Sequence, residues 1–423
     1  MTQLHTLHSP LNEARLWQSV EELSSFTLPG QPWTRRAFSP LFLKSRQWLR
    51  TQFEAAGLTI TLDPAGNLIG RREGRNPAAR PLMTGSHCDT VNSGGRFDGI
   101  IGVLAGIEIA RSMNEHGIVL EHPLEVVDFL SEEPSDYGVS CVGSRAMGGV
   151  LSADMLAEKN AEGETLAQGI TRIGGDPDAL LEARRPPGST AAFVELHIEQ
   201  GPVLESAGLP IGCVTNIVGI RRHRVIVTGR PDHAGTTPMD IRRDALVGAA
   251  KIITAVDHKA RSYLGGEAYL VATIGHLVVS PNASNAVPGK VEMMLEVRSD
   301  KQALLDTFSE PLLAAIANEL EEQGLQLRYS RVSEAAPTDC DETVIRAVDD
   351  AAAQLGYASR RMPSGAGHDA VYMAKSGPIG MVFIPCLNGR SHCPEEWISS
   401  QQLLDGTRVL YQTLLTLDQR IAG

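Results

Sequence analysis

The sequence predicts an α/β domain with a mostly parallel sheet flanked by helices, interrupted by an inserted α+β domain. Short apolar runs alternate with helical patterns in the first half of the chain and again near its end. At about residue 216 the pattern changes to the alternation of apolar and polar residues that antiparallel strands show. The length of 423 residues also exceeds one domain of about 150 residues. We therefore expect one domain from residues 1–215 and 332–423, with the insertion at 216–331.

Helices and a parallel unit are expected first. Residues 11–57 form a helical region that ends at Gly57, a residue that favours a helix C-terminus. Residues 58–72, LTITLDPAGNLIGRR, alternate around a turn and predict a hairpin. The next elements are expected to be a strand, a helix and a strand, at residues 81–87, 99–113 and 124–133. Such a parallel unit binds ligands beyond the carboxyl ends of its strands.

A further strand is expected at 191–201, AAFVELHIEQG, before the pattern changes. The inserted segment then predicts strand, helix, strand, strand, helix and strand, at residues 221–230, 242–260, 267–280, 290–300, 301–324 and 325–332. This order is typical of a ferredoxin-like α+β domain of about a hundred residues. A helix at 342–356 and a strand at 379–386 return the chain to the α/β domain.

Composition excludes several classes of protein. The net charge is −12 and no basic stripe is interleaved with aromatic residues, so we expect no nucleic-acid partner. The longest apolar segments, such as IIGVLAGIEIA, are too short to span a bilayer, and the N-terminus lacks the pattern of a signal peptide. The six cysteines form no CxxC pair, which indicates reduced thiols and a cytoplasmic protein.

Polar side chains that bind divalent metals follow four predicted strands at one edge of the sheet. They are His87, Asp89 and Asp98 in SHCDTVNSGGRFDG, Glu132 and Glu133 in SEEPSDYG, His197 in ELHIEQG and His392 in NGRSHCPEEW. Each has an ordinary alternative: Asp98 fits a helix N-cap, the glutamates fit a solvated loop, and each histidine fits a packed or loop residue.

Taken together, these residues offer the terminal ligands and the bridging carboxylate that two ions roughly 3.5–4 Å apart require. One glutamate is left over, and a carboxylate beside such a site acts as the base in metal-assisted hydrolysis. Asp89 would orient the imidazole of His87. The spacing alone leaves a binuclear metallohydrolase and a set of ordinary loop residues as open alternatives.

Seven ordered motifs between about residues 60 and 400 resemble those of the amidase/hydantoinase/carbamoylase family. They are GSHCDTVNSGGRFDGIIGVLAG, SEEPSDYG, ELHIEQGPVLE, GRPDHAGTTPMDIRRDA, SPNASNAVPGKVEMMLEVR, PSGAGHDA and SHCPEEW. The family holds N-carbamoyl-L-amino-acid hydrolases, β-ureidopropionases, and allantoate and ureidoglycolate amidohydrolases. It lies within the superfamily of binuclear zinc aminoacylases and carboxypeptidases.

The resemblance implies a binuclear centre in which Asp98 bridges the two ions. The ligands would be His87, Asp98 and His197 for one ion, and Asp98, Glu133 and His392 for the other. Glu132 would be the general base, and His233 would stabilise the oxyanion. The substrate would be bound by Gln200, His233, Asn285, Arg298, Gly365 and Gly367. An arginine fork suits a substrate carboxylate. In relatives the inserted domain acts as a lid, mediates dimerisation and can offer its histidine to the partner subunit.

We therefore expect a metal-dependent amidohydrolase that cleaves the carbamoyl C–N bond of an N-carbamoyl amino acid or related ureido acid. The products would be an amino acid, ammonia and carbon dioxide. We expect two divalent ions per subunit, zinc in the first place with manganese, cobalt and nickel as alternatives, and a homodimer formed through the inserted domain.

The same residues admit three other functions. A catalytically dead binding homologue is disfavoured, because all five expected ligands and the expected base Glu132 are present. An aminoacylase or peptidase of the same superfamily is the alternative, because PSDYGVSCVGSRAMGG after the glutamate pair departs from many relatives and leaves the substrate open. A nucleotide-binding loop at GGRFDGIIG is disfavoured, since the chain has neither GxGxxG nor GxxxxGK[ST].

Overall fold

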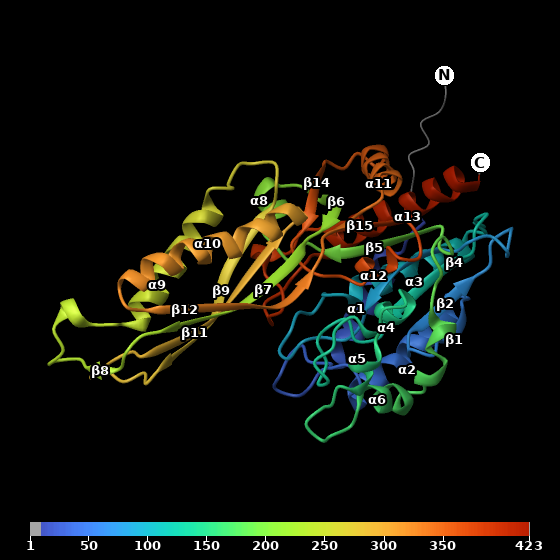
Figure 1. Ribbon diagram of the computed structural model, residues 1–423. Coiled ribbons are helices and arrows are strands. Elements are labelled where there is room, and N and C mark those ends of the chain that lie inside the picture. The colour runs from blue at the N-terminus through green and yellow to red at the C-terminus, as the bar shows by residue number, and fades with distance from the viewer. Residues whose placement is uncertain (1–9, 423) are drawn as a thin grey trace. The chain divides into compact units, whose positions relative to one another are not determined.

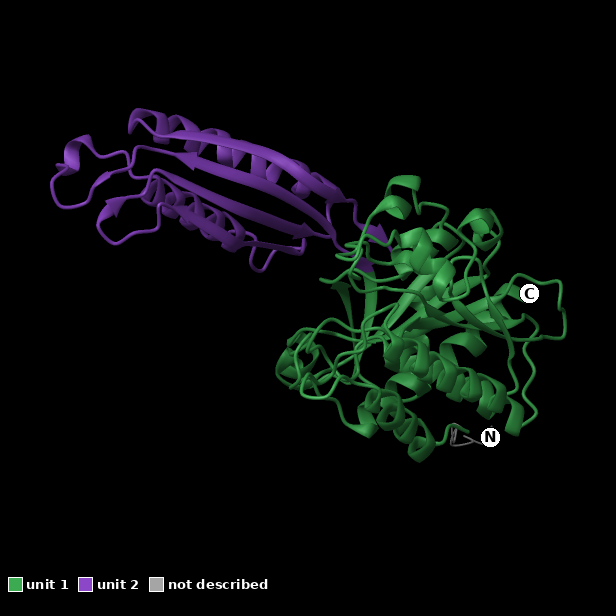
Figure 2. Cartoon of the chain, turned by 90° about the horizontal axis from the view of Figure 1, so that it is seen from below, with its two compact units in different colours: residues 1–215, 340–423 green, residues 216–339 purple. Residues whose placement is uncertain are grey.

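The computed structural model describes residues 10–422; residues 1–9, on which the expected absence of a signal peptide partly rests, and residue 423 lie outside the described residues. Contacts divide the chain into two compact units (Figure 2). Unit 1 holds residues 1–215 and 340–423, and unit 2 holds residues 216–339. Residue 332, where the return to the first domain was expected, lies inside β12 (Gln326–Ala335), a strand of the unit 2 sheet, and unit 1 resumes at residue 340.

The nine-stranded sheet is parallel at its centre and antiparallel at its edges. Its order is β1 (Thr59–Leu62), β2 (Leu68–Arg72), β4 (Leu124–Phe129), β3 (Leu82–His87), β5 (Ala192–Ile198), β15 (Ile379–Ile384), β6 (Ile211–Ile217) and β13 (Thr338–Asp339), with β14 (Ser359–Ser364) paired to β6. The strands β4, β3, β5 and β15 run parallel to one another. The strands β1, β2, β6 and β13 pair antiparallel, so the expected parallel sheet is the core of a mixed one.

Helices cover both faces of the central strands, and this explains why those strands are apolar throughout. All residues of β3, β4, β5 and β15 are buried. The helix α3 (Ile100–Glu115), almost entirely buried, connects β3 to β4, and α13 (Ser400–Ala422) packs on β5 and β15 (Figure 1). The other long helices of unit 1 are α1 (Glu13–Ser25), α2 (Pro40–Ala55) and α11 (Glu342–Gln354).

The helical region expected over residues 11–57 is two helices, α1 and α2, not one. The segment TLPGQPW between them holds two prolines and Gly30, whose φ of 75° suits glycine. Shorter helices occupy later connections: α4 (Val142–Met147), α5 (Ala153–Ala157), α6 (Leu166–Arg172), α7 (Leu180–Ala183), α8 (Val203–Ala207) and α12 (Ala370–Met373), with 3-10 turns η1 (Pro177–Ala179), η2 (Met239–Ile241) and η3 (Leu387–Gly389).

Unit 2 is a four-stranded antiparallel sheet with two helices. Along the chain its elements are β7 (Gly219–Thr228), α9 (Ala245–Arg261), β9 (Leu270–Ser280), β11 (Lys290–Ser299), α10 (Gln302–Glu322) and β12, and the sheet order is β12-β7-β11-β9. Alternate residues of β7 and β11 are buried in one apolar cluster with residues of both helices, including Val225, Met293, Ile252 and Phe308. A small ladder of β8 (Asp232–His233) and β10 (Ala286–Val287) stands apart from this sheet.

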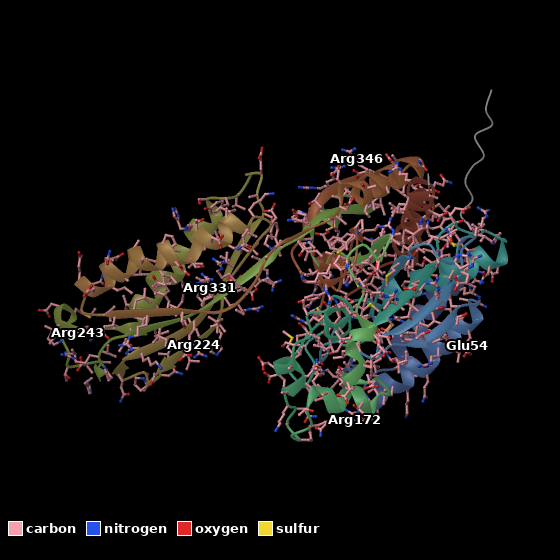
Figure 3. The ribbon with its side chains drawn as sticks, turned by 45° about the vertical axis from the view of Figure 1, so that its right-hand side comes forward. Glu54, Arg172, Arg224, Arg243, Arg331 and Arg346 are labelled. Carbon is pink, nitrogen blue, oxygen red and sulfur yellow. The ribbon has the colours of Figure 1, made fainter. Side chains whose placement is uncertain are left out.

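Four surface arginines that Figure 3 labels, from both units, are paired with carboxylates. The pairs are Arg172 with Glu164, Arg224 with Glu292, Arg331 with Glu310 and Arg346 with Glu342, at 2.8, 3.2, 2.9 and 2.9 Å. Among residues 10–422, no helix combines the length and apolar character needed to cross a membrane.

Candidate metal centre and catalytic residues

The five expected metal ligands lie in unit 1, at or just beyond the carboxyl ends of the parallel strands. His87 is the last residue of β3, and His197 lies one residue before the end of β5. Glu133 follows β4, and Asp98 precedes α3. His392 lies in the loop between η3 and α13. Parallel strands end at the same edge of a sheet, so residues far apart in sequence meet there.

These residues form two groups that share Asp98. In the first group His87, Asp98 and His197 each bring a ligand atom within 4.8 Å of the others, and in the second group Asp98, Glu133 and His392 do the same. Oδ1 of Asp98 lies 3.2 Å from Nε2 of His197, while Oδ2 lies 3.0 Å from Nε2 of His392. One oxygen of the carboxylate therefore faces each group, which is the position of a bridging ligand.

The rings of His87 and His197 are oriented so that the lone pair on Nε2 faces a carboxylate oxygen. Nδ1 of His87 lies 3.1 Å from the carbonyl oxygen of Asp89, and Nδ1 of His197 lies 2.9 Å from that of Ile198. A carbonyl oxygen only accepts, so Nδ1 carries the proton in each ring and Nε2 presents its lone pair. A lone pair that meets a carboxylate oxygen calls for a proton or a metal cation between them.

The second group shows the same preference for positive charge. Oε1 of Glu133 is buried and has no hydrogen-bond partner, although Nε2 of His392 lies 3.1 Å away. The nearby carboxylates of Asp98 and then of Glu133 raise the pKa of His392 to about 11. A site that holds a proton this strongly also attracts a cation, and its nitrogen and oxygen atoms suit divalent transition metals. The residues therefore fit a binuclear centre.

Glu132 lies beside this centre but belongs to neither ligand group. Its side chain is 12% exposed, and Oε2 is 3.7 Å from Nε2 of His87. Sγ of Cys141 donates to Oε1 over 3.5 Å, a contact that the sequence did not indicate. Burial raises the pKa of Glu132 well above its usual range. This combination suits a general base.

Asp89 holds the glutamate pair in place and supports His87 through its main chain. Its two carboxylate oxygens accept the backbone N–H groups of Glu132 and Glu133, each over 3.2 Å. The ring of His87 bonds to the carbonyl oxygen of Asp89, and the carboxylate is 3.5 Å away. The expected orienting role of Asp89 thus comes from its carbonyl, while its carboxylate positions the loop after β4.

Asp98 does not cap the helix that follows it. The N-cap of α3 is Gly99, with a φ of 70° and no side-chain capping hydrogen bond. A Cβ atom at Gly99 would lie 2.4 Å from Nε2 of His87, so glycine is needed for space as well as for backbone conformation. The carboxylate of Asp98 is left to face the two ligand groups.

Gln200, expected to bind substrate, contacts the centre itself. Its Nε2 donates to Oδ1 of Asp98 over 3.2 Å and to Oγ of Ser391 over 3.1 Å. Sequence reasoning missed Ser391 and the buried Glu396 that it bonds to. The only signal for them was their closeness to His392 in the motif SHCPEEW.

The expected glycine loop at Gly365–Gly367 is closed by a buried histidine. Nε2 of His368 lies 2.8 Å from Oγ of Ser364, and this hydroxyl also bonds to Ala366. Burial lowers the pKa of His368 well below its usual range, and its ring packs on His197 with centroids 4.6 Å apart. His368 and His197 also form a third possible ligand group with Glu195.

The remaining expected residues lie in unit 2. His233 is in β8, and the backbone N–H of Ala234 donates to the carbonyl oxygen of Asn285, so these two segments are neighbours. Nδ1 of His233 accepts the N–H groups of Gly235 and Thr236. The neutral ring therefore carries its proton on Nε2, where it can donate.

Arg298 lies on β11 and pairs with Glu296 over 2.7 Å. The same carboxylate also pairs with Arg222 over 2.6 Å. Two guanidinium groups thus share one carboxylate.

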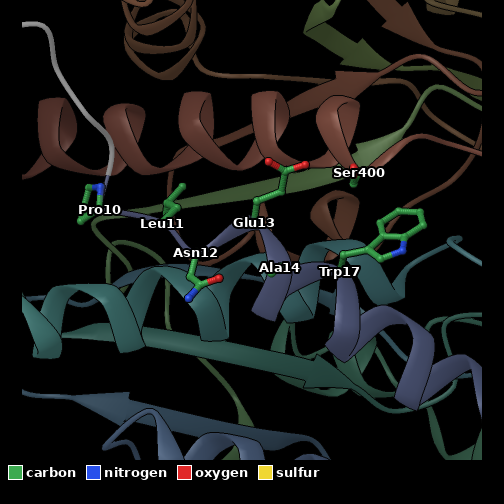
Figure 4. Close-up of a pocket in the computed structure, with 7 residues that line it drawn as sticks. All are labelled: Pro10, Leu11, Asn12, Glu13, Ala14, Trp17 and Ser400. Atoms are coloured by element: carbon green, nitrogen blue, oxygen red, sulfur yellow. The ribbon is translucent and has the colours of Figure 1, made fainter.

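A cavity of about 610 Å³ elsewhere in unit 1 lacks the chemistry of the metal centre (Figure 4). It lies between the start of α1 and the start of α13 and is lined by Pro10, Leu11, Asn12, Glu13, Ala14, Trp17 and Ser400. Only one of these residues carries a carboxylate, and none is a histidine or a cysteine.

Known proteins are similar to this chain in sequence and in fold over nearly its whole length. The family model described as Peptidase family M20/M25/M40 matches residues 83–416. An N-carbamoyl-L-amino acid amidohydrolase of Geobacillus stearothermophilus is 42% identical over 406 residues, which cover 96% of this chain and 98% of that one. A ureidoglycolate hydrolase of Arabidopsis thaliana is 33% identical over 411 residues, covering 95% and 86%. The crystal structure of a hydantoinase/carbamoylase family amidase from Burkholderia multivorans has a TM-score of 0.89 at 36% identity, with 96% and 98% covered.

Proposed function

Since this chain belongs to peptidase family M20/M25/M40 and, within it, to the hydantoinase/carbamoylase amidases, we propose that it hydrolyses the carbamoyl C–N bond of a ureido acid. Relatives that are 42% and 38% identical over 96% of the chain are named N-carbamoyl-L-amino-acid amidohydrolases. The observation that carries the proposal is the carboxylate of Asp98, whose two oxygens face two histidines of different ligand groups. The base candidate Glu132 lies beside them.

Two divalent ions would complete the centre. His87, Asp98 and His197 would hold one ion, and Asp98, Glu133 and His392 would hold the other. Such ions, when bound, polarise the carbonyl group of the substrate and lower the pKa of water. Zinc suits this set of nitrogen and oxygen ligands, and manganese, cobalt and nickel are the alternatives that metal analysis distinguishes.

Glu132 moves the proton in this proposal. It takes a proton from the attacking water as the new C–O bond forms, and passes it to the amino nitrogen as the C–N bond breaks. The amino acid leaves as the amine, and the carbamic acid that remains decomposes to ammonia and carbon dioxide. Burial, which raises the pKa of Glu132, favours a group that must hold a proton between the two steps.

Residues of unit 2 would bind the substrate. Nε2–H of His233 would donate to the developing oxyanion, helped by Asn285 nearby, and Arg298 would pair with the substrate carboxylate. In unit 1, the loop from Gly365 to Gly367 and Oε1 of Gln200 would add further contacts.

We also infer a homodimer that forms through unit 2. The support is β9, an edge strand of 11 residues whose exposed side chains include Val271, Leu277 and Val278. Edge strands of this kind pair readily with a second chain. The six cysteines are free, which supports a reducing compartment such as the cytoplasm.

A substrate panel tests the function. Ammonia release is measured with N-carbamoyl-α-amino acids, N-carbamoyl-β-alanine, allantoate and ureidoglycolate on metal-reconstituted protein, beside an N-acetyl amino acid and a dipeptide scored by amine release. Hydrolysis of a ureido acid that stops on chelation and returns with metal is expected. Turnover of only the acetyl or peptide substrate would overturn the proposal.

Mixing two inactive variants tests the dimer and the role of His233 together. A mixture of His233→Ala and Glu132→Gln chains regains activity if the histidine serves the partner subunit, because one site of each mixed dimer then has both groups. If the histidine serves its own subunit, the mixture stays inactive. Light scattering that gives a monomer mass would refute the dimer.

A further inference from the structure

Glu396 joins the two loops that carry Asp98 and His392. The residue is 1% exposed. Its Oε1 accepts the backbone N–H groups of Phe97 and Asp98 over 2.7 and 3.0 Å, and its Oε2 accepts the hydroxyl of Ser391 over 2.7 Å. One buried carboxylate thus fixes the residue before His392 and the main chain of the bridging ligand. Hydrogen bonds to a charged acceptor are the stronger kind.

Gln200 closes these contacts into a ring. Its amide nitrogen bonds to Oδ1 of Asp98 and to Oγ of Ser391. The ring therefore runs from the side chain of Asp98 through Gln200, Ser391 and Glu396 back to the main chain of Asp98. It connects three segments of unit 1, those that precede α3, follow β5 and precede α13.

Two backbone N–H groups and one hydroxyl donate to Glu396, and this fixes the direction of the bonds that follow. The hydroxyl proton of Ser391 points to Glu396, so the hydroxyl oxygen accepts from Gln200. Gln200 therefore turns its NH₂ group, and not its oxygen, toward Ser391 and Asp98. If the amide turned over, its oxygen would face the carboxylate of Asp98 and the contact would become repulsive.

The chain makes room for this carboxylate. A Cβ atom at Gly95 would lie 1.9 Å from Oε2 of Glu396, so any larger residue would displace it. The φ of Gly95 is not positive, which means that space rather than backbone conformation requires glycine here.

We propose that Glu396 is a positioning residue that holds Asp98 and His392 for the second metal ion, an inference that rests on the metal centre proposed above. The effect should be larger at the second group, because Asp98 belongs to both groups whereas His392 belongs to the second alone. His87 and His197 lie in buried strands, whereas His392 lies in a loop and its side chain is 46% exposed. The ring of hydrogen bonds holds the loop of His392 in place, as the strands hold His87 and His197.

The test compares Glu396→Gln with Glu395→Gln, a matched control one residue away. Glu395 is exposed and pairs with Arg390 on the surface. Metal-free proteins are titrated with zinc against a chelator, and bound metal is counted by elemental analysis after gel filtration. We expect wild type and Glu395→Gln to bind two ions. Glu396→Gln should keep one tight ion and bind the second about 10- to 100-fold more weakly, the usual effect of losing a partner of a metal ligand. Ser391→Ala should weaken the same ion.

Two further measurements separate the outcomes. Thermal unfolding of the metal-free proteins should agree between the two glutamine variants, and excess zinc should restore kcat of Glu396→Gln with little change in KM. Equal affinity for both ions in Glu396→Gln and wild type would overturn the role of Glu396 and leave the proposed function standing. A wild-type protein that binds no ion would overturn the metal centre itself.

Discussion

Glu132 and Glu133 are neighbours in sequence with opposite expected roles, and the same substitution at each separates them. Glutamine keeps the shape of the side chain but cannot take up a proton at neutral pH. In Glu132→Gln the amide oxygen can still accept from Cys141, and neither ligand group loses an atom. In Glu133→Gln a buried oxygen that faces His392 loses its charge.

The expected size of the effect follows from these contacts. Loss of a general base slows turnover about 10²- to 10⁴-fold, which corresponds to about 3 to 5 kcal/mol of transition-state free energy. Glu132→Gln should therefore lose this activity while it keeps two ions per chain. Glu133→Gln should lose one ion and, with it, activity that added metal partly restores.

The assay is kcat from ammonia release, with metal content measured on the same samples. Both variants are needed because a fall in activity alone does not distinguish base from ligand. The reasoning would be refuted if Glu132→Gln kept more than about a tenth of wild-type activity. The loss would then be less than about tenfold, which is smaller than the loss typical of removing a general base. It would also be refuted if Glu132→Gln lost an ion that Glu133→Gln retained.

Three further predictions concern the framework of the site. Gly99→Ala should lower the free energy of unfolding by about 1–2 kcal/mol, because the φ of Gly99 is 70°. It should also reduce metal content, because the added Cβ atom would lie 2.4 Å from the ring nitrogen of the histidine that ends β3. Melting temperature and metal analysis check this, and wild-type values for both would contradict it. Arg46→Leu should cost about 3–5 kcal/mol in urea unfolding, since it leaves the fully buried Asp128 without its ion-pair partner 2.9 Å away; a loss below about 1 kcal/mol would show that the pair is dispensable. The hydrogen bond from Arg172 lowers the pKa of Glu164 from 4.5 to about 2, so this carboxylate stabilises the fold above pH 4.5 and the contribution fades as pH falls toward 2. Both side chains are partly exposed, so Glu164→Gln should remove at most about 1 kcal/mol at pH 7 and flatten the loss of stability between pH 5 and pH 3, and unchanged acid unfolding would reject the effect.

The central strands could be predicted from the sequence because each is buried on both faces and so reads as an apolar run. The antiparallel edges could not be placed in the same way. The strand β6 pairs with β15, β13 and β14, which lie more than a hundred residues later in the chain. The pattern of its own residues does not indicate which distant strands it pairs with. The end of the inserted unit lies beyond residue 332 for a related reason, since β12 resumes its pairing with β7 after a register shift between Arg331 and Ser333.

Residue types and their positions at strand ends predicted which residues form the site. The contacts between their side chains could not be predicted from the sequence. For Asp98 the sequence left a helix cap and a metal ligand open; the structure argues against the cap, because Gly99 takes that position, and the metal ligand stays a proposal. For Gln200 the resemblance indicated a substrate contact, whereas its amide also reaches Asp98 and Ser391, residues 102 and 191 positions away. Only the folded chain brings such groups together.

The insertion of unit 2 determines when each candidate metal ligand is synthesised during translation. His87, Asp98, Glu133 and His197 all precede residue 216, whereas His392 follows the whole inserted unit. At bacterial or eukaryotic rates of synthesis the delay between His197 and His392 is on the order of 10 to 40 s. During that interval the emerging chain holds one complete ligand trio, while the second lacks its histidine and β5 lacks its neighbour β15. Under the proposed ligand assignment only the finished polypeptide could bind both ions, and a chain cut short before His392 would carry one complete ligand group.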